Sequence, residues 1–165
     1  MSGAIPVITR QETGETLWFG GSLVTLKVTS EQAGGVLCMI EQAASRGKTT
    51  PLHVHPNHDE TAYVLEGELR FHIDGVEHVA GPGDVVWVPR GTPHAFVVIS
   101  DKERSLWVNT PGEAMEAFYR QAGDIADSSS LPSAEIDIAR LIAAGEATSA
   151  MKVLGPPPFP REMLA

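Results

Sequence analysis

Four residues with metal-binding side chains constrain what this chain can fold into more than any other feature of its sequence. His53 and His55 are two residues apart, so on an extended strand both imidazoles leave the same face. Glu60 follows a Pro-Asn turn, and His94 lies on a separate segment that begins after a Pro-Arg-Gly turn. Three imidazoles and one carboxylate from different strands suit a divalent first-row metal. The sequence therefore predicts a fold in which distant strands meet at one metal ion.

The spacing of these residues resembles the two motifs of the cupin superfamily. Residues 47–67 fit the first motif, Gly-x5-His-x-His-x4-Glu-x6-Gly, at every fixed position. Residues 83–98 fit the second, Gly-x5-Pro-x-Gly-x2-His-x3-Asn, except that Val98 replaces the terminal Asn, which is not a ligand in the family. The resemblance covers residues 20–110. It implies an all-β jelly-roll barrel that places His53, His55, Glu60 and His94 around one metal.

The rest of the chain fits a barrel with an added C-terminal region. Short β-rich segments separated by Gly and Pro turns, without βαβ alternation, predict strands over residues 16–110, after a polar arm at 1–15. Residues 111–165 predict a helical extension: one helix over 112–121 and a second that opens at Ser133 and stops at Gly145. We expect both helices outside the barrel or over one mouth. The Pro-rich tail from Met151 is predicted to be extended and not a fold element.

Composition excludes several classes of function. The net charge of −9 argues against partners that are polyanions, so we expect neither nucleic acid nor an anionic membrane surface. A single cysteine, Cys38, rules out an intramolecular disulfide. The sequence contains no signal-peptide pattern and no apolar run of membrane-spanning length, so we expect a cytoplasmic protein. Cupins commonly pair through their sheets, and the resemblance therefore implies a homodimer.

Two questions about the site stay open at this stage. His58 could replace Glu60 as a ligand if its loop turned inward, but the matching position varies in cupins, so we expect it outside the ligand set. Aromatic and apolar residues on the strands, Phe96 and Val98 beside His94 and then Tyr63 and Phe71, are candidates for contacting a substrate. An ordinary role in the barrel core is equally compatible with each of the four.

The donor set favours chemistry over a purely structural metal. Three imidazoles and one carboxylate leave one or two positions of an octahedral ion open to a substrate oxygen, water or O₂. The resemblance extends to quercetinase-like cupins, supported by residues 109–119. It implies a dioxygenase that cleaves a flavonol across carbons 2 and 4, or acts on another small aromatic substrate, with Glu60 as the catalytic base. The alternatives are a non-redox isomerase, cyclase or lyase, and a binding module without turnover. Iron, nickel, manganese, cobalt, copper and zinc all tolerate this donor set.

Overall fold

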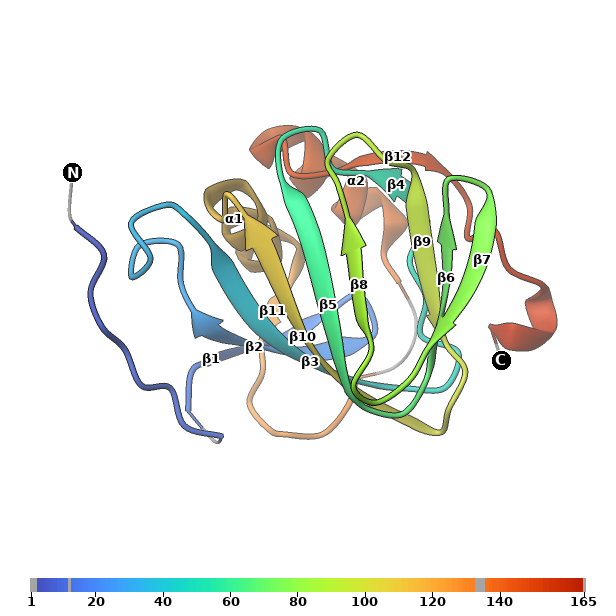
Figure 1. Ribbon diagram of the computed structural model, residues 1–165, viewed down its shortest axis with the longest axis horizontal. Coiled ribbons are helices and arrows are strands. Elements are labelled where there is room, and N and C mark those ends of the chain that lie inside the picture. The colour runs from blue at the N-terminus through green and yellow to red at the C-terminus, as the bar shows by residue number, and fades with distance from the viewer. Residues whose placement is uncertain (1–2, 12, 133–135, 165) are drawn as a thin grey trace.

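The structure is a computed structural model that describes residues 3–11, 13–132 and 136–164, and it is built from two antiparallel sheets that face each other (Figure 1). The larger sheet has the order β11-β1-β2-β3-β10-β5-β8 and the smaller sheet the order β12-β4-β9-β6-β7. The strands of the larger sheet are β1 (Glu15–Phe19), β2 (Ser22–Val28), β3 (Cys38–Ser45), β5 (Asp59–Glu66), β8 (Val85–Val88), β10 (Lys102–Thr110) and β11 (Asp124–Ile125). Those of the smaller sheet are β4 (Leu52–Val54), β6 (Leu69–Ile73), β7 (Val76–Ala80), β9 (His94–Val98) and β12 (Lys152–Gly155). This arrangement confirms the predicted all-β barrel.

Alternation along the strands decides which side chains enter the barrel. In β3 every second residue is buried, and this set includes Ile40 and the polar Gln42. In β10 the buried set includes Glu103 and Trp107. Because successive side chains of a strand point to opposite faces, these residues all line the interior. The interior is therefore mostly apolar, with a few polar groups at fixed places.

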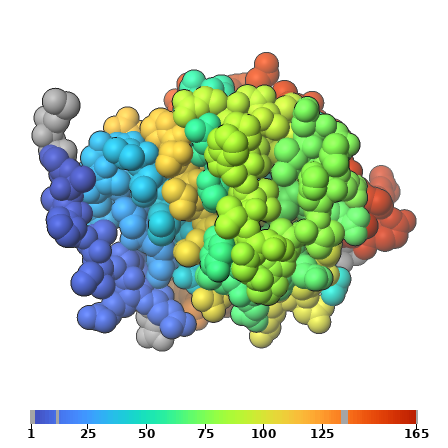
Figure 2. All heavy atoms as spheres, viewed as in Figure 1, coloured from blue at the N-terminus to red at the C-terminus, as the bar shows by residue number. Residues whose placement is uncertain are grey.

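Strand β9 is buried on both faces, which is unusual among these strands. Its outward residues Ala95 and Val97 pack against Phe159 of the C-terminal tail. The tail then ends in a 3-10 turn, Arg161–Met163, on the far side of the molecule from the N-terminal residues (Figures 1 and 2). Covering the outer face of β9 in this way holds fixed the strand that carries His94.

The C-terminal region contributes two helices, α1 (Glu113–Ala122) and α2 (Ile138–Thr148), as expected. The start of α2 is capped by Asp137, whose side chain accepts the Arg140 N–H at 2.9 Å, whereas the predicted cap, Ser133, lies outside the described residues. The prediction that Gly145 stops this helix is wrong. Gly145 lies inside α2, where a Cβ would come within 2.5 Å of the Met151 carbonyl oxygen, so glycine permits close contact with the following segment.

The prediction that the tail forms no fold element is also wrong, because residues 152–155 form β12 and pair with β4. Strand β4 is only three residues long, and β12 occupies the edge that it would otherwise expose. Both helices pack over one mouth of the barrel, near the end where β4 and β12 lie (Figure 1). Within the described residues, neither helix has the length and apolar character needed to cross a bilayer.

Candidate metal centre

Three buried imidazoles meet in the barrel. His53 comes from β4, His55 follows directly after it, and His94 begins β9, where it is the register partner of His53. One ring nitrogen from each histidine lies within 4.8 Å of the other two. The short strand β4 and its pairing with β9 bring the three rings together, although His94 is about forty positions later in the sequence.

Each of the three rings is oriented by a backbone carbonyl. The Nδ1 atoms of His53, His55 and His94 lie 2.9, 2.8 and 2.9 Å from the carbonyl oxygens of three residues, Pro51, Ala150 and Thr92 respectively. A carbonyl oxygen only accepts, so Nδ1–H donates in all three rings and Nε2 is turned toward the cluster. Metal-binding histidines are fixed in this way by their second nitrogen. The carbonyl that orients His55 belongs to the segment after α2.

Glu60 of β5 completes the group. Its carboxylate oxygens lie 3.5 Å from Nε2 of His55 and 3.2 Å from Nε2 of His94. Burial raises the pKa of Glu60, but the attraction and hydrogen bonds of His55 and His94 outweigh burial and hold that pKa well below its usual range. The buried carboxylate of Glu60 is therefore ionised.

The protonation of the histidines follows from the same geometry. Burial, followed by the neighbouring imidazoles, holds the pKa of His53 well below its ordinary value, so this ring is neutral. Burial lowers the pKa of His94, but the hydrogen bond and attraction of Glu60, together with the hydrogen bond to the Thr92 carbonyl, outweigh burial, and the net pKa is raised. A cation bound here would therefore displace a proton shared by His94 and Glu60. The orientation of the rings, their burial and the single carboxylate all fit a divalent transition metal.

His58 is buried beside the cluster. Its ring centre lies 4.3 Å from that of His55, and among the described residues neither of its ring nitrogens has a hydrogen-bond partner. Burial, and then the nearby His55, lowers its pKa to about 4, so the ring is neutral. His58 does not belong to the group of nitrogens within 4.8 Å of one another. It packs against that group and is not turned to solvent.

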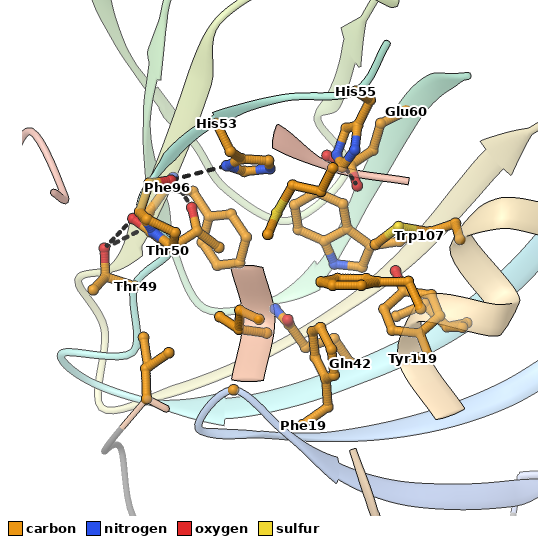
Figure 3. A pocket seen from close by; sticks show the side chains of 18 of the residues that line it. Phe19, Gln42, Thr49, Thr50, His53, His55, Glu60, Phe96, Trp107 and Tyr119 are labelled. Carbon is orange, nitrogen blue, oxygen red and sulfur yellow. Dashed lines mark hydrogen bonds and ion pairs between the residues drawn. The ribbon is translucent and has the colours of Figure 1, made fainter. Parts of the chain in front are cut away.

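A small cavity of about 50 Å³ opens beside the three imidazoles. His53, His55 and Glu60 lie along one side of it, Gln42 and Phe19 lie on the opposite side, and Phe96 and Trp107 lie between (Figure 3). The rings of Phe96 and Trp107 have their centres 5.0 Å apart and are inclined by 32°. The cavity therefore places an aromatic wall next to the predicted metal ligands.

Only one of the four predicted substrate-contact residues lines this cavity, and it is Phe96. Tyr63 is 41% exposed, because β5 turns Glu60, Ala62 and Val64 inward and leaves Tyr63 on the outer face. Phe71 and Val98 do point into the barrel, but they are part of its packed core and are not cavity-lining residues. The structure does not bring these three side chains to the site.

Several cavity residues were not predicted from the sequence. Gln42 and Trp107 come from strands β3 and β10. The alternation of inward and outward side chains along these strands could have indicated that both residues point into the barrel. Lys48 lies in a loop with no periodic pattern. The helices contribute further lining residues, among them Met115, Phe118, Tyr119 and Leu141, which no motif marks.

Comparison with known proteins shows which proteins this chain resembles in sequence and in fold. Residues 40–110, somewhat less than half of the chain, match the family model described as a cupin domain. Over 114 residues the chain is 27% identical to quercetin 2,3-dioxygenase of Bacillus subtilis strain 168, an alignment that covers 69% of this chain and 34% of that protein. The chain thus spans about a third of the length of this curated relative.

Solved structures share the fold at lower identity. A protein from Thermotoga maritima described as a predicted oxalate decarboxylase is 19% identical, with a TM-score of 0.59 over 64% of this chain and 99% of its own. An RmlC-like cupin from Shewanella frigidimarina NCIMB 400 is 23% identical, with a TM-score of 0.57 over 65% of this chain and 92% of its own. These similarities establish the cupin fold and do not choose a reaction.

Proposed function

We propose that this protein is a mononuclear metal-dependent dioxygenase whose substrate is a small aromatic molecule with adjacent oxygen atoms. The observation that carries the proposal is the set of three buried imidazoles whose Nε2 atoms face one point, with Glu60 beside them and an aromatic cavity in front. The similarity to part of a quercetin 2,3-dioxygenase supports the same conclusion.

His53, His55, Glu60 and His94 would hold the ion, which when bound supplies open positions where oxygen atoms of a substrate are polarised. Glu60 has a second role, because an ionised and buried carboxylate can accept the proton of a substrate hydroxyl. Phe96 and Trp107 would position an aromatic ring against a flat apolar wall. The apolar lining excludes water from the reacting atoms.

The size of the cavity favours a one-ring substrate. Its volume of about 50 Å³ is well below the roughly 300–1,000 Å³ of pockets that enclose drug-sized ligands. A catechol-type ring therefore requires less expansion of the cavity than a full flavonol, which would require a larger movement of the cover formed by α1 and α2. Within the class of flavonol-like and other small aromatic substrates, we propose the smaller members.

A second candidate is a non-redox isomerase, cyclase or lyase that uses the metal as a Lewis acid. It is favoured by a proton donor in the cavity wall, Tyr119, whose hydroxyl oxygen lies 3.5 Å from Nδ2 of Asn109. Burial, and then the nearby Glu60, raises the pKa of Tyr119 well above its usual value, so the phenol is protonated. A protonated phenol and an ionised carboxylate that line the same cavity could hold and transfer a proton without O₂.

Oxygen dependence separates these candidates. The protein would be purified without added metal, analysed for bound metal, and reloaded in turn with iron, manganese, nickel, cobalt, copper and zinc. Uptake of O₂ with catechol-type or flavonol substrates, and its loss in Glu60→Gln, is the expected result. Product formed without O₂ in the zinc-loaded protein would establish the Lewis-acid enzyme instead. Saturable binding without product under every metal would show that the protein is a binding module.

A further inference from the structure

A buried lysine lines the same cavity as the predicted metal ligands. Lys48 is only 3% exposed, and its Nζ lies 4.4 Å from the centre of the Phe96 ring. The ammonium group carries three N–H donors, and the described residues supply one hydrogen bond, to the carbonyl oxygen of Thr49 at 3.2 Å. A buried cation with unused donors is costly unless another group pairs with it.

The protein supplies a nearby carboxylate but no direct ion pair. Of the two carboxylates that raise the pKa of Lys48, Glu103 acts more strongly than Glu60, yet within the described chain neither forms a salt bridge with it. Glu103 is instead held by Gln42, whose Nε2 donates to Oε2 at 3.0 Å, while the other carboxylate oxygen, Oε1, has no hydrogen-bond partner among the residues that the structure describes. Gln42 in turn accepts a hydrogen bond from Ser22 at 3.2 Å.

This arrangement places a polar group on the cavity wall opposite the metal ligands. Gln42, which lies across the cavity from His53 and His55, holds the carboxylate that acts most strongly on Lys48 (Figure 3). Elsewhere the wall between the two sides is mostly apolar and aromatic, with polar groups from two threonines and the Tyr119 hydroxyl among the described residues that line the cavity. The threonine hydroxyls beside Lys48 are already engaged with the backbone of Phe96. Among the described residues that line the cavity, Lys48 is therefore the positively charged donor that an anionic ligand could use.

We propose that Lys48 binds a carboxylate of the substrate, so that the substrate is a small aromatic acid with its oxygen pair at the metal end and its acid group at the Lys48 end. The inference rests on the proposed function in that it assigns the ligand to the same cavity. The unused N–H donors of the ammonium group suit an anionic acceptor such as a carboxylate. A buried hydrogen bond between charged groups is among the stronger hydrogen bonds in proteins.

The titration of the two buried groups is consistent with this role. Burial lowers the pKa of Lys48 to about 8, so the ammonium form still predominates at neutral pH. Burial raises the pKa of Glu103 to about 7, so this carboxyl can take up a proton when a second anion arrives beside Lys48. When a ligand carboxylate binds beside Lys48, Glu103 can thus be protonated, and the ligand and Glu103 do not both carry a negative charge.

The test compares two ligands that differ only in the acid group. Binding of 3,4-dihydroxybenzoate and of 3,4-dihydroxybenzamide to the zinc-loaded full chain would be measured by calorimetry, without O₂ and without turnover. We expect the wild type to bind the acid at least about tenfold more tightly than the amide. Lys48→Met should reduce that ratio to about one and change the affinity for the amide little. Lys102→Met, at an exposed lysine, should keep the wild-type ratio.

Lys48→Met could fail to fold because it leaves Glu103 without a nearby cation. The double variant Lys48→Met/Glu103→Gln removes both buried charges and should likewise lose the preference. Equal affinities in the wild type, a preference that survives in either variant, or no binding of either ligand would overturn the inference. A preserved, Lys48-dependent preference without any O₂ uptake would uphold Lys48 as the carboxylate anchor and overturn the dioxygenase instead.

Discussion

The substitution His94→Ala should remove the stabilisation that metal gives to this fold. His94 is buried, is paired in register with His53, and supplies one of the three nitrogens that lie within 4.8 Å of one another. Because the two histidines come from strands β4 and β9, a shared ion would cross-link these strands. Unfolding separates the ligands, so the metal binds the folded state preferentially and raises the free energy of unfolding.

The expected size of the effect follows from mass action. At free metal of 100 times the dissociation constant, binding to the folded state contributes about 2.7 kcal/mol. For a chain of 165 residues, each kcal/mol shifts the melting temperature by roughly 2–4 °C. Metal should therefore raise the melting temperature of the wild type by about 5–11 °C. The shift in His94→Ala should be less than about 2 °C, because the same free metal is then far from saturating.

The measurement is the change in melting temperature that metal causes in each variant. Unfolding is monitored by circular dichroism in chelator-treated buffer, with and without added metal. Absolute melting temperatures would mislead, because removing His94 also takes a partner from the buried Glu60, and breaking a buried pair costs about 3–5 kcal/mol. His78→Ala is the matched control, since His78 is exposed on β7 and should keep the full shift. A full shift in His94→Ala would exclude His94 as a ligand, and no shift in the wild type would refute the site.

Four further predictions follow from the site and its surroundings. Metal affinity should fall as the pH drops through about 6–7, starting with His94, whose pKa is raised, because protons then compete for the imidazoles. Glu103→Gln should raise the free energy of unfolding more at pH 8 than at pH 5, by up to about 3 kcal/mol, as measured by urea unfolding. The pKa of the wild-type carboxyl is about 7 in the folded protein and about 4.5 in the unfolded chain, so the wild type loses stability as the pH rises between these values. Gly145→Ala should destabilise the fold, although alanine favours helices by about 1 kcal/mol, because its Cβ would meet the Met151 carbonyl; chemical denaturation measures this. His58→Ala should leave the metal content, measured by elemental analysis, unchanged, because its ring lies outside the ligand group.

Each of these has a clear contrary outcome. A flat pH profile of metal affinity would argue against histidine ligation. If the free energies of unfolding of Glu103→Gln and the wild type differ by the same amount at pH 5 and pH 8, Glu103 ionises normally in the folded protein. Ala143→Gly, at an exposed position of the same helix, should cost about 1 kcal/mol, so a stabilising Gly145→Ala would refute the steric argument. Loss of metal in His58→Ala would place that ring among the ligands.

The sequence predicted the barrel and the meeting of the three histidines because both depend on local patterns. Turn residues and strand alternation set the register, and His53 and His94 then become partners through the pairing of β4 with β9. Tyr63 and Val98 were harder to place. The inward or outward direction of Tyr63 follows from Glu60 three positions earlier, but Val98 points inward and still misses the cavity. Direction along a strand does not reveal where the interior is filled and where it is empty.

The C-terminal region explains why the cavity itself could not be predicted from the two motifs. The carbonyl of Ala150, after α2, orients His55, while Met115 and Leu141 of the two helices close the cavity. The hydrogen bond from the His55 side chain joins residues 95 positions apart, and neither this bond nor the packing of the helices leaves a pattern in the sequence. The motif residues thus provide the candidate metal ligands, whereas the access, size and polarity of the site also depend on a region outside the motifs. Differences in substrate between proteins with this barrel are therefore expected to arise from such covers and from single buried residues such as Lys48, more than from the ligand set.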